Sequence, residues 1–392
     1  MNKLIRTIAL CITLGLAGTA VAQVNVGGQV MNNEKNYIST GIPIIMIAPD
    51  AISSAMGDAG VASEPDCYSS HWNNAKFAFI DGDWGISTTY TPWLRKLQVY
   101  DMNLLFLGGY TRINDRSTAA ASLTYFSLGE MQNTTIDNEV IGTMRPNEFA
   151  FDITYAMKLT DNLSLGATGR FITSDLTNGQ DVSNQAGVTT THAGVSLAAD
   201  VGIYYTTQVD KKQEVAFGAL ISNLGNKLSY SDDDNDKEFL PSNIRIGGRY
   251  SNTIDDYNKV NVLLDFNKLL VPSRPIPFDP ARYNSIGVIE GAFMSFADAP
   301  GGLTEELQEI QISAGAEYWY AETFAIRAGY FFEHENKGGR QYLTLGAGLR
   351  YNVFNFDFSY LVPTTLLGNN PLTNTFRISI TLNMAPDKNN AQ

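Results

Sequence analysis

Hydrophobic and polar side chains alternate without a break along residues 147–159, whose sequence is NEFAFDITYAMKL. Successive side chains of a β-strand point to opposite faces, so this alternation predicts a strand with one apolar face and one small or polar face. The apolar face would carry Phe149, Phe151, Ile153, Tyr155, Met157 and Leu159, and the other face Ala150, Asp152, Thr154, Ala156 and Lys158.

The same period of two recurs along most of the chain and predicts fourteen strands. Many have about ten residues or more, which is longer than the five or six usual in soluble sheets and close to what a tilted strand needs to cross a bilayer. The predicted strands are 84–92, 100–112, 117–127, 147–159, 163–174, 193–207, 213–225, 242–251, 259–270, 308–320, 323–334, 341–351, 354–362 and 374–384.

Short and long connections alternate between these strands, as they do in outer-membrane barrels, where periplasmic turns are short and extracellular loops are long. An even strand number also places both ends of the barrel on the periplasmic side. The short connections are 113–116, 160–162, 208–212, 252–258, 321–322 and 352–353, and the long ones are 128–146, 175–192, 226–241, 271–307, 335–340 and 363–373.

These patterns predict an all-β fold, a fourteen-stranded antiparallel transmembrane β-barrel of the bacterial outer membrane over residues 84–384. The apolar faces would meet lipid, and the polar faces would meet the lumen. The alternative is a soluble β-sandwich or propeller, in which the apolar face would form the core and the polar face would meet water.

The N-terminal region divides into two parts ahead of the first strand. Residues 1–22 resemble a secretory signal peptide, because Lys3 and Arg6 precede an apolar run and Ala20 and Ala22 offer a small-residue cleavage site. Residues 23–83 are rich in Gly, Ala, Asn and Ser, with apolar patches at 41–57, which favours a plug or hatch inside the barrel over a flexible periplasmic arm. Residues 385–392 form a short C-terminal tail.

Composition and charge narrow the classes of partner and chemistry. The formal charge of the whole chain is −13, and it becomes −15 once Lys3 and Arg6 leave with the signal peptide, so we expect no nucleic-acid partner. We expect no catalysis, metal or cofactor, because three isolated histidines and one mature cysteine, Cys67, show no motif spacing. The acidic loop 231–238 offers hard oxygen ligands for Ca²⁺, but it lacks the EF-hand pattern and fits a solvated loop better.

The connection 271–307 is the most informative loop, since it is long and unusually apolar. Ile286, Ile289, Phe293 and Phe296 recur at helical spacing and predict a short amphipathic helix over 285–297. Its apolar face either folds over the barrel's own mouth or grips a partner.

Several segments of the chain resemble the PorV (LptO) family of outer-membrane barrels of the type IX secretion system. They are GALISNLGNKLSY (218–230), FLPSNIRIGGRY (239–250), LLDFNKLLVPSRP (263–275) and SFADAPGGLTEELQEI (295–310). The segment HWNNAKFAF (71–79) also resembles the wider FadL-like barrels, although Asn74 stands where their pattern usually has proline. The resemblance covers about 48–384 and implies a fourteen-stranded barrel with an N-terminal hatch.

The resemblance also implies a function. PorV-like proteins receive secreted cargo by its C-terminal signal domain from the type IX translocon, and carry it to a surface attachment complex with a sortase-like peptidase. Besides outer-membrane lipid, we therefore expect these polypeptides as partners. We expect cargo to bind on the outer loops through Phe293, Phe296, Ile289, Asp298, Pro300, Leu366 and Leu367. The alternatives are a FadL-like transporter of fatty acids or other small hydrophobic molecules, and an enzyme that modifies surface lipopolysaccharide.

Overall fold

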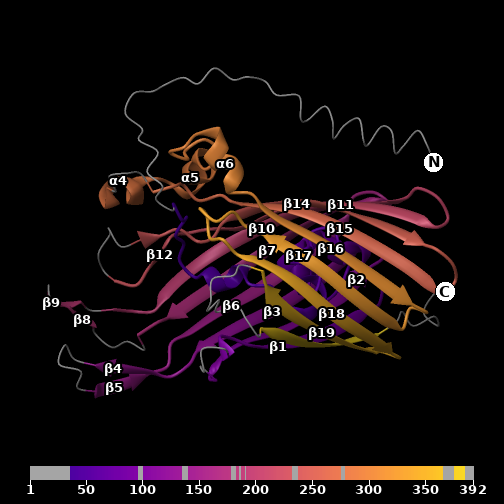
Figure 1. Cartoon of the computed structure of the whole chain (residues 1–392), viewed down its shortest axis with the longest axis horizontal. Helices are drawn as coiled ribbons and strands as arrows, with labels where there is room; N and C mark the ends of the chain where they lie inside the picture. Colours follow the sequence, from indigo (N-terminus) through magenta and orange to yellow (C-terminus); the bar gives the residue numbers. More distant parts are fainter. Residues whose placement is uncertain are drawn as a thin grey trace. The chain divides into compact units, whose positions relative to one another are not determined.

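The computed structural model describes residues 36–95, 100–134, 140–177, 182–184, 187–189, 191–231, 237–274, 279–364 and 375–384. Fourteen antiparallel strands pair in chain order and close into a barrel, because β1 pairs with β20 from Trp84 opposite Met384 to Tyr90 opposite Ile378 (Figure 1). The barrel strands are β1 (Trp84–Pro92), β2 (Met102–Asn114), β3 (Ser117–Leu128), β6 (Asn147–Lys158), β7 (Leu163–Asp175), β10 (Gly194–Gln208), β11 (Gln213–Gly225), β14 (Asn243–Thr253), β15 (Asn258–Leu269), β16 (Gln311–Tyr320), β17 (Phe324–Phe332), β18 (Gln341–Tyr351), β19 (Phe354–Pro363) and β20 (Phe376–Met384).

The predicted fold class is confirmed, and the strand limits differ from the prediction by at most three residues. The smaller elements lie in the connections or inside the barrel. The paired strands are β4 (Met131–Thr134) with β5 (Val140–Met144), β8 (Val182–Asn184) with β9 (Gly187–Thr189), and β12 (Leu228–Ser229) with β13 (Lys237–Glu238). The helices are η1 (Pro43–Met46), α2 (Ala51–Ser54), α3 (Ser69–Trp72), η2 (Asn74–Phe79), α4 (Pro280–Ser285), α5 (Val288–Met294) and α6 (Leu303–Gln308).

The apolar faces of the strands point outward, as β6 illustrates. Phe151, Ile153 and Tyr155 are exposed on the outside of the barrel, whereas Asp152 and Thr154 are buried on the inside. This orientation rules out the sandwich or propeller alternative, in which the apolar face would be the core. No helix within the described ranges is long and apolar enough to span a membrane.

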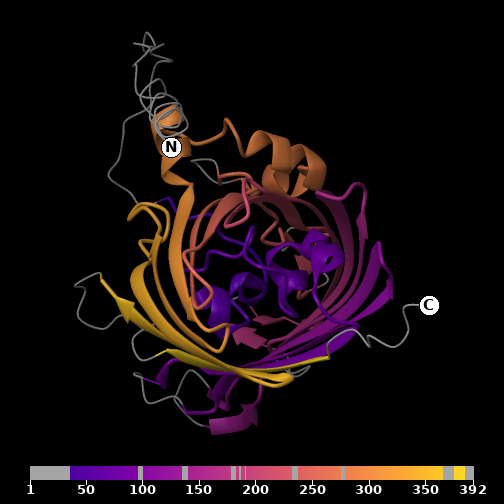
Figure 2. The same ribbon diagram turned by 90° about the vertical axis from the view of Figure 1, so that its right-hand side faces the viewer.

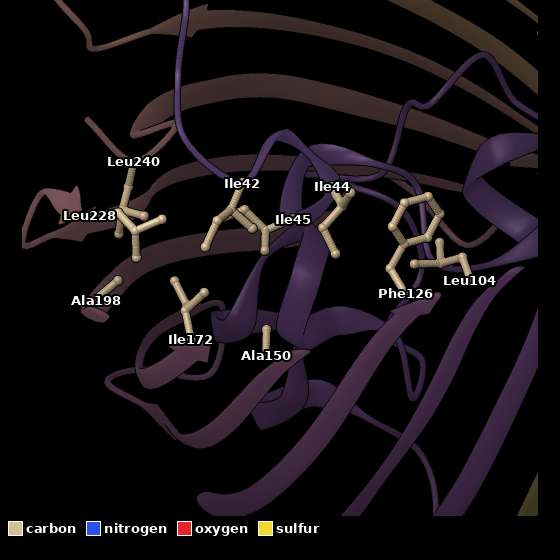
Figure 3. Packing of buried hydrophobic residues seen from close by; sticks show 10 residues of the cluster. All are labelled: Ile42, Ile44, Ile45, Leu104, Phe126, Ala150, Ile172, Ala198, Leu228 and Leu240. Carbon is tan, nitrogen blue, oxygen red and sulfur yellow. The ribbon is translucent and has the colours of Figure 1, made fainter. Parts of the chain in front are cut away.

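Most of the segment 36–83 lies inside the ring of strands, and we call this segment the plug (Figure 2). Its first helix, η1, packs Ile44 and Ile45 against Phe126 and Ile172 of the barrel wall, as Figure 3 shows. Farther along the plug, Phe77 packs with other buried apolar side chains of plug and wall. The hydrophobic core of the molecule is therefore the contact between plug and wall.

Glycines on the inner wall let the plug backbone approach closely. Gly315 and Gly329 are paired on β16 and β17, and a Cβ atom at Gly329 would lie 2.1 Å from the Met56 carbonyl carbon. Gly57, next in the plug, has a φ of +69°, which glycine adopts without steric penalty. The Met56–Gly57 turn therefore fits a hollow that side chains would fill.

Buried ion pairs hold neighbouring strands on the luminal side of the wall. Arg170 Nε lies 2.7 Å from Asp152, and its Nη2 lies 3.0 Å from Asp200. Arg327 similarly lies between Glu317 at 2.6 Å and Asp357 at 2.7 Å. Each arginine thus has two carboxylate partners, which offsets the cost of burying its charge.

Candidate functional site

The connection between β15 and β16 carries α4, α5 and α6, at the end of the barrel where the long connections gather (Figure 1). Seen along the barrel, these helices lie beyond the ring of strands (Figure 2). The predicted helix over 285–297 corresponds to α5, which is shorter because the chain turns at Gly287 and again after Met294.

One side of this loop is packed against the neighbouring connection. Phe239 and Tyr283 meet edge to face with ring centres 5.4 Å apart, and the Lys227 ammonium lies 3.9 Å from the Phe239 ring centre. The Tyr283 hydroxyl donates to the Pro272 carbonyl oxygen at 3.1 Å. Ile286 is half-buried against this cluster, so the first residue of the predicted apolar stripe serves the loop's own packing.

Ion pairs fasten the second half of the loop to the barrel rim. Lys268 of β15 donates to Glu306 at 3.1 Å and also to Glu309, and Lys337 donates to Glu305 at 2.6 Å and Glu309 at 3.0 Å. Because these groups are largely buried, each cation offsets the desolvation of the carboxylates it contacts. The loop is therefore fixed on its polar side.

The other side of the loop exposes large apolar side chains, which we call the apolar loop surface. The helices pack through small residues such as Gly291 and Ser295, which are buried, and this turns the apolar stripe outward. Its members, with their exposed fractions, are Ile289 (55%), Phe293 (76%), Phe296 (52%), Leu303 (69%) and Leu307 (60%).

The remaining predicted site residues lie elsewhere. Asp298 is half-buried and accepts a hydrogen bond from the Ser273 amide at 2.8 Å, so its carboxylate braces the loop. Burial raises the pKa of Asp298 to about 6, and the nearby Glu306 and Glu309 act in the same direction. Pro300 is half-buried beside it. Leu366 and Leu367 lie outside the described residues, as do Asp232, Asp233, Asp234 and Asp236 of the acidic loop.

A cavity of about 630 Å³, which we call the mouth pocket, opens at the long-connection end of the barrel above η1. Its apolar wall comes from Ile44, Ile47, Trp93, Met102, Phe126 and Leu128. Arg377 of β20 also lines it and is only 4% exposed. Sequence reasoning missed this site, because its residues come from the plug and from both ends of the barrel sequence. In the sequence, the feature that could have indicated this site was Arg377, a charged residue on the polar face of a predicted strand.

A second cavity of about 580 Å³ lies on the other side of the plug, toward the short turns. It is lined by charged groups, among them Glu64, which is ion-paired with both Arg249 and Lys259. The two cavities thus differ in chemistry, one largely apolar and one largely charged.

The plug segment that resembles FadL-like barrels lies between the cavities and contacts the wall. Asn73 Nδ2 donates to the carbonyl oxygens of Val61 at 3.0 Å and Ile203 at 2.9 Å. Asn74 Nδ2 donates to the Thr168 hydroxyl at 3.0 Å. The asparagine that replaces the usual proline therefore ties the plug to β7.

Comparison with known families identifies the chain. The model of the type IX secretion system protein PorV matches residues 30–276. The chain belongs to the PorV family. This PorV-family barrel is an integral outer-membrane protein and an outer-membrane component of the type IX secretion system. Among curated protein sequences, none matches the chain.

Solved structures with a similar fold include FadL-family barrels. A deletion mutant of the TodX monoaromatic hydrocarbon channel has a TM-score of 0.50 at 12% identity, covering 86% of this chain and 98% of its own. The match to the toluene transporter TodX of P. putida covers 86% of this chain and 98% of the transporter, with a TM-score of 0.49 and 11% identity. The match to a Pseudomonas aeruginosa FadL homologue covers 89% of this chain and 99% of the homologue, with a TM-score of 0.44 and 13% identity. At such identities the similarity concerns the fold alone, which for this PorV-family chain is FadL-like.

Proposed function

We propose that this barrel binds the C-terminal signal domain of secreted cargo at its outer mouth and carries it from the type IX translocon to the sortase-like attachment complex. The observation that carries the proposal is the apolar loop surface, whose side chains stay exposed on a loop that is fixed on its polar side. Exposed apolar patches outside the lipid-facing band are typical of protein interfaces. The chain acts by binding in this proposal, with no catalytic step, metal or cofactor.

The orientation of the barrel in the membrane follows the same proposal. The Asp83 amide donates to the Met384 carbonyl oxygen at 3.0 Å, so both ends of the barrel lie at the end with the short turns. In outer-membrane barrels the short turns face the periplasm. The long connections and the apolar loop surface then face the cell exterior, where cargo emerges.

Phe293 and Phe296 are the best candidates for anchors, since a few aromatic side chains carry most of the energy of a typical interface. Loss of one such anchor weakens binding by about 2 kcal/mol, which is about thirtyfold in affinity. A carrier must also release its cargo, and an interface that depends on few anchors fits this requirement.

The test is cargo association of the double variant Phe293→Ser, Phe296→Ser after gentle detergent extraction of the outer membrane, with mass spectrometry of copurifying polypeptides and lipids. We expect the wild type to bring down secreted polypeptides that share a C-terminal domain, and the variant to lose them while the barrel stays inserted. The control is Ile254→Ser, Tyr257→Ser, which removes similarly exposed apolar groups (50% and 62%) in a short turn at the other end. If the Phe293→Ser, Phe296→Ser variant copurifies as much cargo as the wild type, the proposal is wrong.

The alternative is transport of small hydrophobic molecules, as in the TodX monoaromatic hydrocarbon channel. The mouth pocket favours it, since most of its wall is apolar. A transporter needs a continuous apolar path, however, and the cavity beyond the plug is lined by ion-paired Glu64, Arg249 and Lys259. Copurified fatty acids or other small hydrophobes without secreted polypeptides would favour the transporter.

A further inference from the structure

Arg377 is a buried cation on the wall of the mouth pocket, and its pairing differs from that of Arg170 and Arg327. Its Nε donates to the Ala48 carbonyl oxygen of the plug at 3.0 Å. Within the part of the chain that the structure describes, no carboxylate lies in ion-pair distance of its guanidinium, whereas Arg170 and Arg327 have two each. A carbonyl oxygen satisfies one donor but leaves the buried charge without a counter-ion, which is costly.

The carboxylates that line the same pocket already have partners. Asp58 accepts from the Tyr342 hydroxyl at 2.5 Å, and Glu148 accepts from the Ser174 hydroxyl at 3.0 Å. Glu238 accepts from Arg274 at 2.8 Å. The charge of Arg377 is therefore available to an anion that enters the pocket.

The second lining arginine, Arg340, is differently placed. Its Nε and Nη2 both bind Glu333, each at 2.8 Å, in a forked pair. Arg340 is thus already neutralised, and Arg377 is the better candidate for holding an incoming anion.

The chemistry of the pocket wall indicates what kind of molecule would supply that anion. A guanidinium binds a carboxylate through two parallel hydrogen bonds, which gives both energy and orientation. The apolar wall around Ile44, Ile47 and Phe126 would accept apolar side chains, and the cavity of about 630 Å³ has the size of a ligand site. Ser39 and Thr40 also line the pocket, and the backbone groups of a peptide can hydrogen-bond to their hydroxyls, whereas a hydrocarbon tail cannot.

We infer that the mouth pocket binds the last residues of a polypeptide, with the α-carboxylate on Arg377 and apolar side chains against the wall of Ile44, Ile47 and Phe126. A peptide supplies both the anion and backbone groups that can pair with the pocket hydroxyls. The inference rests on the proposed function, in that the polypeptide is taken to be the end of a cargo chain. It adds a second contact, inside the mouth, to the apolar loop surface outside it.

The test uses the purified full-length protein in detergent and a dansyl-labelled hexapeptide of alternating serine and valine that ends in valine. We expect the peptide with a free carboxylate to bind about tenfold or more tightly than its C-terminal amide, because the amide lacks the charge that Arg377 pairs with. In Arg377→Gln the two peptides should bind equally weakly. Equal binding of acid and amide by the wild type overturns the inference, as does an unchanged preference in Arg377→Gln.

Two further variants control for folding and position. Arg350→Gln is the matched control, since Arg350 lies near the other cavity and pairs with Glu322 at 3.3 Å, and it should keep the preference for the acid. Ile47→Trp narrows the pocket while the chain keeps Arg377, and this variant should lose binding of the acid. If Arg377→Gln fails to fold, the acid and amide comparison in the wild type and in Ile47→Trp still decides the question.

Competition with palmitic acid separates a peptide site from a fatty-acid site. Displacement of the peptide by palmitic acid, together with equal binding of acid and amide peptides, would overturn the inference in favour of a lipid site. Failure of this inference is distinguishable from failure of the proposed function. Cargo that copurifies without any acid preference leaves the proposed function standing and removes the inference, whereas acid-specific binding without copurifying cargo supports the pocket and removes the cargo assignment.

Discussion

Replacing Gly329 with alanine would test whether the plug is fixed by the glycine hollow on the barrel wall. The new Cβ atom would lie 2.1 Å from the Met56 carbonyl carbon and 2.2 Å from the Gly57 nitrogen. Both are backbone atoms, so no side-chain rotation relieves the overlap. Since ordinary contact begins near 3.4 Å, the plug turn must retreat by about 1 Å.

The free-energy cost of this displacement follows from the hydrogen bonds that it breaks. The Gly57 amide donates to the Thr344 hydroxyl at 2.9 Å, and the neighbouring Asp58 accepts from Tyr342 at 2.5 Å. Overpacking costs about 1–3 kcal/mol, and each lost hydrogen bond adds about 1 kcal/mol. A total of about 3 kcal/mol shifts the docking equilibrium of the plug about a hundredfold toward the undocked state.

Trypsin cleavage after Lys76 measures that equilibrium, because Lys76 is fully buried in the plug and becomes accessible only when the plug leaves its site. We expect faster cleavage in Gly329→Ala and a higher conductance in planar bilayers. The matched control is Gly169→Ala on the outer face, where a Cβ meets no atom within 4 Å, and it should behave as wild type. If Gly329→Ala is as resistant as Gly169→Ala, the close fit does not hold the plug.

Three further changes test the loop and the plug. In Lys268→Met the carboxylates of Glu306 and Glu309 lose a buried counter-ion. We expect the loop to be destabilised by up to about 5 kcal/mol and to become sensitive to protease cleavage. Adding Glu306→Gln and Glu309→Gln should restore resistance to the protease. The pKa of Asp298 is raised by burial to about 6 from 3.8, so its contribution to loop stability is complete below about pH 4 and is lost as the pH rises through about 6. Hydrogen exchange of the loop, corrected for intrinsic rates, should show this loss, and Asp298→Asn should abolish it. Asn73→Ala removes hydrogen bonds to two carbonyl oxygens and should destabilise plug docking by about 1–3 kcal/mol, which trypsin cleavage would detect; unchanged cleavage would contradict the role of Asn73.

The sequence predicted the barrel strands well because their information is local. Each strand must present lipid-facing and lumen-facing side chains in alternation, so Phe151 and Asp152 lie on opposite faces whatever the rest of the chain does. The ends were less certain where a strand runs into a structured loop, as before β16, which begins at Gln311 rather than at 308.

The candidate site was predictable only in part. The helical spacing of Ile289, Phe293 and Phe296 predicts an amphipathic helix, but spacing alone does not say whether its apolar face points inward or outward. Phe239 of the neighbouring connection and Tyr283 of the same loop decide this, since they fill the packing side and contact Ile286. The three later residues of the stripe are left exposed.

By itself, then, the sequence determined the strand number, the alternation of short and long connections, and the apolar outer face. Only the tertiary structure decided how the plug meets the wall and which buried charges are paired. Ala48 and Arg377 are 329 positions apart, and the contact between them exists only because the barrel closes around the plug. Periodicity reports on the environment of each residue, whereas the pairing of buried charges depends on which distant residues share that environment.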